Sequence, residues 1–518
     1  MSSLRKLALL FLFPLSAMAQ GDLMGKSLNK IQFADQFPGA DACVQIQHAI
    51  AALPTNGGEI DGRGFLGFFK CSVNPFGNIL RHPGESVHLY LAAGSTFTTT
   101  AQWVIPLGSI VTGGGSVPGG GRGTTLIADP TFPINTPVVY LGDFNASGGS
   151  LIENITIDCN HVKGSVGVFS DRVQELGGVR NISVINYKAV GIEMVDQFDL
   201  PPNTGGSPEN FIMDELQLSG DADSTCILVR VGVGGQRGGG HITCSSSLVE
   251  TGNLSCSAGV VTATFTANTI HKGTAIGVES GTGSRFNGLF KVTRSSATQL
   301  QWSQPGCSGT SIAAGVGTMV ESGVQLDGSD GVYSQIHCEF TVDCVLTDSA
   351  SLQSGWVTRA LTISGVTGQS TVKNIVHLGA ATHSEDIILT ALQRCIGPTA
   401  ATQQCATNVL QDDLNSVTLQ EASLAWYLVG HSSSGGASAL LSSSPSVSWL
   451  VPAPFLEFHS SSTLSQLGEQ KNGSFTYCSD CKVATPSSCS AANPSACICS
   501  GGGTGAFAKR LNGAWLCD

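Results

Sequence analysis

The sequence predicts an all-β protein that folds as a parallel β-helix, and three observations support this prediction. The chain of 518 residues contains 65 glycines and only 12% charged residues, a composition that does not suit a helical protein. A motif of alternating apolar and polar residues recurs at a nearly constant spacing, and a second motif follows it in several repeats. A strand that returns to the same place once per solenoid coil produces this pattern.

The first motif gives the length of one coil. Its first apolar residues are separated by steps of 27, 34, 26, 94, 25, 26 and 30 residues, and they are Ile155, Ile182, Leu216, Ile242, Ile336, Leu361, Ile387 and Val417. The long step holds one coil and roughly 70 further residues. These residues, 248–318, contain short alternating strands with closely spaced turn residues. This pattern of residues predicts a small antiparallel β module inserted between two coils.

The second motif places a further strand in each coil, about a dozen residues after the first. It reads GVFS from Gly167, GIEM from Gly191, CILV from Cys226 and GVQL from Gly323. Aligning the repeats predicts one outward column of Asp158, Ile185, Ser219, Ser245 and Glu339. It predicts two more columns on the second strand, one of Phe169, Glu193, Leu228 and Gln325, the other of Asp171, Val195, Arg230 and Asp327.

A single helix is expected near the N-terminus, over residues 41–53. Asp41 is the expected N-cap, Pro54 and Gly57-Gly58 end the helix, and one face carries Cys43, Ile46, Ile50 and Leu53. A solenoid must cover the exposed strand edge of its first coil. We therefore predict that this helix caps the β-helix.

Composition divides the chain into six segments. We expect a signal peptide over 1–19, the first part of the β-helix with its capping helix over 31–247, and the inserted module over 248–318. Later coils are expected over 319–430, a Ser-rich linker over 431–470 and a Cys-rich C-terminal segment over 471–518. The signal has Arg5 and Lys6 before the apolar run Leu7 to Leu15, and cleavage is expected after Ala19. No later apolar run is long enough for a membrane span.

The signal and the cysteines indicate a secreted protein, periplasmic or extracellular. All 17 cysteines follow the signal, and exported chains form disulfides. Cys338 with Cys344, and Cys395 with Cys405, are spaced to close single loops. In the tail, disulfides are favoured over a zinc site, so no metal is expected there. The net charge of −12 argues against a nucleic-acid partner.

The N-terminal half resembles a known family. The run FPGADACVQIQHAIAALPTNGGEIDGRG, followed by VHLYLAAGSTFT, IPLGSIVTGGG and GRGTTLIAD, resembles the pectate-lyase-like superfamily of secreted right-handed parallel β-helix proteins. The insert and the C-terminal segment, with SRFNGLFKVT and GGGTGAFAKRLNGAWLCD, are similar to modules of phage tail and bacterial surface proteins. The resemblance implies a right-handed coil and a polysaccharide partner, and it leaves a homotrimer open.

The candidate site lies on two neighbouring coils. Carboxylates on adjacent coils have the spacing that glycosidases use, so the expected catalytic residues are Asp158, Asp171, Glu193 and Asp196. The expected substrate-binding residues are Lys163, Arg172, Tyr187 and Trp356. Ordinary solvated carboxylates, ion-paired with Lys163, Arg172, Arg180 and Lys188, remain the alternative. Asp327, Asp330 and Glu339 form a second candidate beyond the insert.

The expected function is degradation of a polysaccharide in a groove along the β-helix. The set of Asn-Thr-Asp, Asp-Asp, Gly-His-Gly and Arg-Ile-Lys motifs that the polygalacturonate hydrolases carry is not present in this chain, so no catalytic residue is carried over from them. The scarcity of basic residues near the patch favours hydrolysis over elimination. No cofactor is expected, although a lyase would require Ca²⁺. The alternative function is a non-catalytic adhesin or tail-fibre-like surface protein that binds glycan.

Overall fold

The computed structural model describes the parts of the chain that carry most of the regular structure. The described residues are 30–77, 86–116, 123–142, 148–170, 177–195, 211–233, 241–280, 286–347, 361–369, 371–379, 386–390, 392–393, 395–396, 404–412, 423–427, 441–442, 449–450, 475–478, 482–483, 498–502, 506–511 and 514–517. Two compact units are present, and residues 1–427 and 439–450 make up the first. Nearly all regular structure in these residues is β-strand, so the all-β prediction is confirmed.

The first sheet has 13 strands among the described residues. They are β1 (Ile31–Phe33), β2 (Gly57–Gly62), β3 (Gly67–Cys71), β4 (Ser86–Leu91), β5 (Ser95–Thr99), β7 (Ile110–Thr112), β8 (Thr124–Ala128), β10 (Leu151–Asp158), β12 (Gly178–Tyr187), β14 (Ile212–Gly220), β16 (Ile242–Ser246), β25 (Ile336–Cys338) and β28 (Thr367–Gly368). Every pairing in this sheet is parallel.

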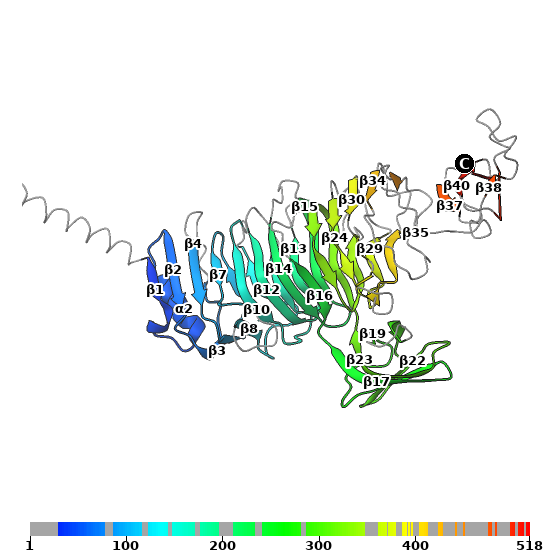
Figure 1. Ribbon diagram of the computed structural model, residues 1–518. Coiled ribbons are helices and arrows are strands. Elements are labelled where there is room, and N and C mark those ends of the chain that lie inside the picture. Colours follow the sequence, from blue (N-terminus) through cyan, green and yellow to red (C-terminus); the bar gives the residue numbers. More distant parts are fainter. Residues whose placement is uncertain are drawn as a thin grey trace, which may run out of the picture. The chain divides into compact units, whose positions relative to one another are not determined.

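The second sheet has 14 strands among the described residues. They are β6 (Trp103–Ile105), β9 (Pro137–Leu141), β11 (Val166–Ser170), β13 (Val190–Val195), β15 (Thr225–Val233), β24 (Val320–Ser334), β26 (Thr341–Thr347), β27 (Leu361–Ser364), β29 (Asn374–Leu378), β30 (Asp386–Thr390), β33 (Asn408–Asp412), β34 (Ser423–Tyr427), β35 (Leu441–Ser442) and β36 (Trp449–Leu450). From β9 to β16 the chain alternates between the two sheets (Figure 1), so each circuit adds one strand to each.

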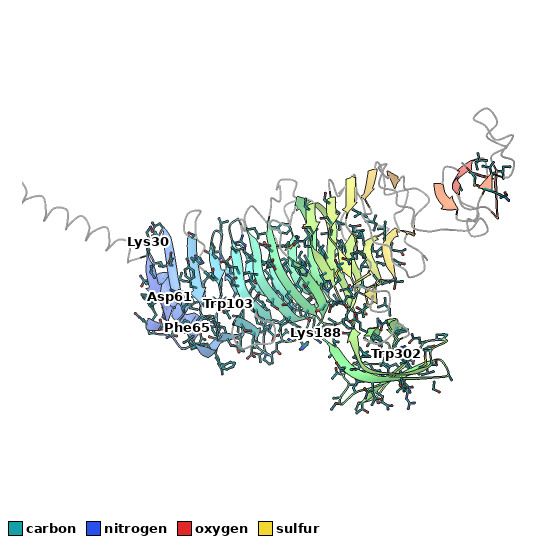
Figure 2. All side chains as sticks on the ribbon, in the orientation of Figure 1. Lys30, Asp61, Phe65, Trp103, Lys188 and Trp302 are labelled. Atoms are coloured by element: carbon teal, nitrogen blue, oxygen red, sulfur yellow. A yellow bond between two sulfur atoms is a disulfide. The ribbon has the colours of Figure 1, made fainter. Side chains whose placement is uncertain are left out.

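We call the first and second sheets the parallel body. Its interior is apolar: Phe97 packs edge-on against Trp103, and both side chains are fully buried. Figure 2 shows Trp103 on the strands of this body and Trp302 in a separate sheet. Stacked parallel strands around such a core are typical of a β-helix-like fold.

The registers place the predicted columns side by side. Ile155 pairs with Ile182, Ile182 with Leu216, Leu216 with Ile242, and Ile242 with Ile336. On the second sheet, Phe169 pairs with Glu193, Glu193 with Leu228, and Leu228 with Gln325. Val195, Arg230 and Asp327 likewise form one row. The period of the apolar residues therefore gave the correct register for these coils.

Four repeats of the first motif begin at a corner where the backbone is left-handed. Asn154, Asn181, Glu215 and Gln335 have φ values of 56°, 46°, 52° and 56°, the left-handed conformation that asparagine tolerates better than most residues. Asn181 Nδ2 also donates to Asn154 Oδ1 at 2.6 Å. At Asn154, Asn181 and Glu215 the turn lies inside β10, β12 and β14 of the first sheet, and at Gln335 it lies between β24 and β25.

The extension of the first column beyond Ile336 was wrong. Leu361 and Ile387 lie on β27 and β30 of the second sheet, where Leu361 pairs with Gly331 and Ile387. The strand that follows β25 in the first sheet is β28, in which Thr367 pairs with His337. The spacing between two motifs gives the length of one coil. It does not show on which strand of the coil a motif lies, because each coil carries several strands. Val417 lies outside the described residues.

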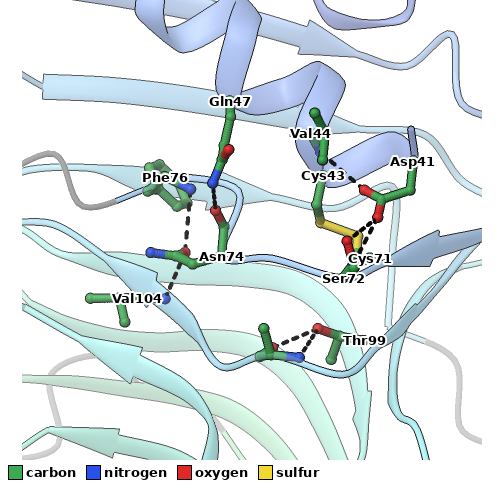
Figure 3. Close-up of a disulfide and its surroundings, with 11 residues drawn as sticks. Asp41, Cys43, Val44, Gln47, Cys71, Ser72, Asn74, Phe76, Thr99 and Val104 are labelled. Carbon is green, nitrogen blue, oxygen red and sulfur yellow. Dashed lines mark hydrogen bonds between the residues drawn. A yellow bond between two sulfur atoms is a disulfide. The ribbon is translucent and has the colours of Figure 1, made fainter. Parts of the chain in front are cut away.

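The expected N-terminal helix is α2 (Ala42–Ala51), preceded by the 3₁₀ turn η1 (Ala34–Gln36). Asp41 is its N-cap and accepts a hydrogen bond from Val44 N at 3.0 Å. Its buried face includes Cys43, Ile46 and Ile50, and it lies where β1 and β2 begin the parallel body (Figure 1). The Cys43–Cys71 disulfide joins it to β3 (Figure 3).

An antiparallel sheet interrupts the parallel body between β16 and β24. Its seven strands are β17 (Val249–Ser257), β18 (Val260–Thr264), β19 (Ala275–Glu279), β20 (Gly288–Lys291), β21 (Arg294–Ser295), β22 (Gln299–Ser303) and β23 (Gly309–Thr318). These strands enclose a core of their own that includes Ile276, Val316 and Trp302. We call this sheet the insert; it lies within the segment 248–318 marked by the sequence.

An aromatic ring packs between the insert and the parallel body. Phe340 of the parallel body is 4% exposed. A Cβ atom added to Gly317 would lie 2.6 Å from Phe340 Cδ1, and one added to Gly277 would lie 3.0 Å from it. The glycines of β19 and β23 thus leave the space that the ring fills.

The second unit consists of short strands near the C-terminus. β37 (Phe475–Cys478), β40 (Ala506–Leu511) and β41 (Ala514–Cys517) form one sheet, and β38 (Lys482–Val483) pairs with β39 (Cys499–Ser500). In the first unit, β31 (Cys395–Ile396) pairs with β32 (Gln404–Cys405) and brings the two predicted partner cysteines opposite each other.

The cysteines of the described residues are mostly paired. The five disulfides are Cys43–Cys71, Cys226–Cys244, Cys256–Cys307, Cys338–Cys344 and Cys499–Cys517, and Cys338–Cys344 was predicted. Cys159 is a buried free thiol. Disulfides at this number are typical of an oxidising compartment. No helix within the described ranges has the length and apolar character needed to cross a membrane.

Candidate functional site

The structure separates the two predicted carboxylates that it describes. Asp158 ends β10 in the first sheet, next to Ile185 of β12. Glu193 lies on β13 in the second sheet, next to Phe169 and Leu228. Asp158 Oδ1 accepts hydrogen bonds from Asn160 N at 2.8 Å and Asn186 Nδ2 at 2.9 Å. Asp158 therefore fixes a corner of the coil, and it does not share a site with Glu193.

The other predicted residues are placed as follows. Tyr187 is fully buried and donates its hydroxyl to Cys226 Sγ at 2.8 Å. Its predicted role in substrate binding is therefore wrong, because no ligand at the surface reaches it. Lys163 is exposed in the turn between β10 and β11. Asp171, Arg172, Asp196 and Trp356 lie outside the described residues.

The basic residues near the predicted patch form ion pairs, but with other carboxylates. Arg180 lies 3.5 Å from Glu153 and 3.9 Å from Asp214, and Lys188 lies 3.7 Å from Asp221. These side chains are nearly half exposed, so each pair contributes little to stability.

A continuous polar surface lies on the first sheet beside the insert. Four neighbouring strands, β14, β16, β25 and β28, alternate buried residues with polar residues that are at least partly exposed. We call the exposed set the polar array; its members are Gln217, Ser219, Thr243, Ser245, His337, Glu339, Thr367 and Gln369. Adjacent strands are about 4.8 Å apart, so hydroxyl, amide, imidazole and carboxylate groups repeat at that interval across the face.

One edge of the polar array meets the insert at a pair of glutamates. Glu279 lies at the end of β19 and accepts a hydrogen bond from Thr371 Oγ1 at 3.3 Å. Thr371 is buried and its Oγ1 accepts from Phe340 N at 2.9 Å, so it is fixed beside Glu339. Glu339 Oε1 lies 3.1 Å from His337 Nε2 and accepts from Gln369 Nε2.

The two glutamates differ in their surroundings. Burial and, to a smaller extent, the negative charge of Glu339 together raise the pKa of Glu279 to about 7. Glu339 is 35% exposed and is held by the two donors named above. His337 stacks on His241 with ring centroids 6.2 Å apart. Near neutral pH a large share of the Glu279 carboxyl is therefore protonated.

This arrangement is suited to acid–base chemistry. Two carboxyl groups whose environments separate their pKa values provide a proton donor and a proton acceptor at the same pH. Among the described residues no group of three or more His, Cys, Asp or Glu side chains has an arrangement that fits a metal ion. The chemistry available at this junction is proton transfer next to a surface of hydroxyl, amide and imidazole groups.

Sequence reasoning found Glu339 as part of a second candidate but missed Glu279. Asp327, grouped there with Glu339, lies instead on β24 in the second sheet. Glu279 lies in the insert, 60 residues before Glu339 in the chain, and no spacing rule links the two. The sequence GVE at the end of β19 did not indicate a functional glutamate, because the strand that pairs with β19 and the neighbouring Thr371 come from other parts of the chain.

Comparisons with known proteins give little further information. No protein-family model matches the chain, and no curated protein matches it. Among solved structures, the chain is similar to ORF18 of Geobacillus virus E2, with 11% sequence identity and a TM-score of 0.30. The match covers 80% of this chain and 65% of the viral chain. A TM-score this low does not establish a shared fold.

Proposed function

We propose that the protein is an exported glycoside hydrolase that binds a neutral glycan on the polar array and cleaves it at the Glu279–Glu339 pair. The observation that carries this proposal is the mostly buried carboxyl of Glu279 beside Glu339, because its pKa of about 7 leaves a large share of it protonated near neutral pH. Glycosidases need such a pair.

The roles follow from the two environments. Glu279 donates its proton to the bridging oxygen as the bond between that oxygen and the anomeric carbon breaks. Glu339 supplies the negative charge, either by attacking the anomeric carbon or by taking a proton from the attacking water. His337 and Gln369 hold Glu339 in place. The hydroxyl and amide groups of the polar array bind the sugar hydroxyls on either side.

Elimination fits this surface less well. A lyase must neutralise a uronate carboxylate while a base removes the neighbouring proton, and this requires a cation. The polar array contains no Lys or Arg, and it carries the charge of Glu339. A neutral polysaccharide is therefore the substrate class that this face favours.

The experiment is a hydrolysis assay of the secreted chain on neutral and uronate polysaccharides, following new reducing ends and the absorbance of an unsaturated product. We expect reducing ends without that absorbance, and a loss of about 10²- to 10⁴-fold for Glu279→Gln. Glu321→Gln is the control, since burial also raises the pKa of Glu321 and Glu321 lies on β24 of the second sheet. Loss of activity in Glu321→Gln, but not in Glu279→Gln, would move the site to the second sheet.

A second candidate is the non-catalytic glycan binder. It is favoured by the hydrogen bond from Thr371 to Glu279, because a mostly buried carboxyl at a junction can serve assembly alone. Glycan binding with no product on any polysaccharide, for the parent and for Glu279→Gln alike, would select this candidate.

We also propose the finer fold assignment, a right-handed parallel β-helix of the pectate-lyase-like type. The parallel pairing and the alternation between sheets support it, and parallel crossovers are right-handed in nearly all known cases. A crystal structure with a left-handed coil would exclude it.

A further inference from the structure

The second sheet carries a group of side chains that takes no part in the proposed hydrolysis. Tyr140, Phe169 and Glu193 occupy one row on the neighbouring strands β9, β11 and β13. The Tyr140 and Phe169 rings are 5.7 Å apart at a tilt of 50°, and both side chains are partly exposed. Adjacent strands are about 4.8 Å apart, so Glu193 lies at the edge of this aromatic pair.

Arg230 is held next to Glu193 by two carboxylates. Its Nη1 lies 3.6 Å from Glu193 Oε1, and its Nε lies 3.6 Å from Asp327 Oδ2. Gln325 Nε2 donates to Asp327 Oδ1 at 3.1 Å. Asp327 is buried, whereas 37% of the Arg230 side chain is exposed. The buried carboxylate of Asp327 therefore holds the guanidinium on one side, and the other side is exposed to solvent.

The donors of Arg230 are not fully used. Both ion pairs are longer than a hydrogen bond of 2.7 to about 3.2 Å, and the buried Nε has no hydrogen-bond partner. A guanidinium has five N–H donors in a fixed plane. A ligand hydroxyl at the exposed part of the guanidinium would accept from its remaining N–H groups, although the buried Nε lies out of a ligand's reach.

We propose that Tyr140, Phe169, Glu193 and Arg230 form a second glycan-binding site, which holds one neutral sugar residue and does not cleave it. A sugar ring stacks on the aromatic pair with its apolar face, as ligands do on Tyr and Phe platforms. Its hydroxyls accept from Arg230 and donate to Glu193. The site lies on a different sheet from the polar array, and it does not depend on the hydrolysis proposed above.

Charge selects the ligand class. Two carboxylates and one guanidinium leave a net negative charge when all three are ionised. Burial raises the pKa of Glu193, and Arg230 opposes that change. A uronate or sulfated sugar would bring a further negative charge to this site, so neutral sugars bind better.

The test is calorimetric titration of the full exported chain carrying Glu279→Gln, with cellohexaose, mannohexaose, xylohexaose and, as the charged comparison, hexagalacturonate. We expect at least one neutral hexamer to bind and hexagalacturonate to bind more weakly. Phe169→Ala and Arg230→Lys should each raise Kd at least about tenfold. Phe68→Ala is the matched control, because Phe68 is an 89% exposed phenylalanine on β3 of the first sheet.

The outcomes separate the proposals. Unchanged binding in Phe169→Ala, an equal loss in Phe68→Ala, tighter binding of hexagalacturonate, or no binding of any neutral hexamer would each overturn the second site. If Arg230→Lys fails to fold because Asp327 loses its partner, Phe169→Ala decides alone. Hydrolysis that persists in Phe169→Ala with Glu279 intact, together with a raised hexamer Kd for Phe169→Ala in the Glu279→Gln chain, would support both sites independently.

Discussion

Thr371 donates a hydrogen bond to Glu279 at 3.3 Å, although the two residues are 92 positions apart in the chain. The same hydroxyl accepts from Phe340 N, so one buried threonine ties the insert to the parallel body. The carboxyl it contacts has a pKa raised to about 7 by burial and by Glu339. Stability and activity should therefore both depend on the protonation of this one group.

The first prediction concerns stability and pH. The pKa of Glu279 is higher in the folded chain, about 7, than its ordinary value of 4.5, so the folded state binds the extra proton between these pH values. Stability from this group is present below pH 4.5 and is lost as pH rises toward 7, by ~3 kcal/mol. In Glu279→Gln this loss disappears. Thermal melts of both chains from pH 4 to 9 measure the difference, and a difference independent of pH would contradict the assignment.

The second prediction concerns the rate of hydrolysis and pH. Because Glu279 must be protonated to act as the acid, kcat/KM should fall tenfold per pH unit above about 7. Replacing His337 by Gln should change the alkaline limb little, since the proton belongs to Glu279. An alkaline limb that moves with His337→Gln instead would assign the proton to the imidazole.

The third prediction concerns the glycines beneath Phe340. A Cβ at Gly317 would lie 2.6 Å from the Phe340 ring, whereas one at Gly315 on the same strand would have no neighbour closer than 3.7 Å. Gly317→Ala should lower the free energy of unfolding by about 1 to 3 kcal/mol, and Gly315→Ala should have little effect. Urea denaturation measures both. The added variant Phe340→Leu should recover part of the loss in Gly317→Ala.

The fourth prediction concerns the corner at Asn181, where φ is 46°. Asn181→Ala and Asn181→Gly both remove the hydrogen bond to Asn154, but only alanine resists the left-handed conformation. Asn181→Ala should therefore be less stable than Asn181→Gly by about 1 kcal/mol. Equal denaturation midpoints for the two variants would show that the corner is not under this constraint.

The fifth prediction concerns the Cys43–Cys71 disulfide, which holds α2 against β3 (Figure 3). Asp41 strengthens this attachment, since its carboxylate accepts from Val44 N and Ser72 N at 3.0 and 2.9 Å. The double variant Cys43→Ala/Cys71→Ala should lose about 2 to 4 kcal/mol of stability. Amide hydrogen exchange should show the loss first in residues 42–51. Unchanged protection there would mean that packing alone holds the helix.

The parallel arrangement was predictable because each coil of a β-helix-like fold repeats the same pattern of buried and exposed residues in the sequence. Residues such as Ile155, Ile182 and Leu216 must face the core once per coil, so their spacing gives the coil length and the register. Asp41 likewise indicates where α2 begins, because it is an N-cap residue directly before residues whose apolar side chains lie on one helical face. The error at Leu361 arose because spacing does not say which strand of a coil a motif belongs to.

The sequence by itself determined the all-β class, the coil length, the register of the central columns and the interruption by a differently patterned segment. Only the tertiary structure decided which polar side chains meet. It separated Asp158 from Glu193, buried Tyr187, and brought Glu279 of the insert to Glu339 of the parallel body. The reason is physical: periodic burial is a local property that each coil repeats, whereas a raised pKa depends on which distant segments exclude water from one carboxyl and place a second charge beside it.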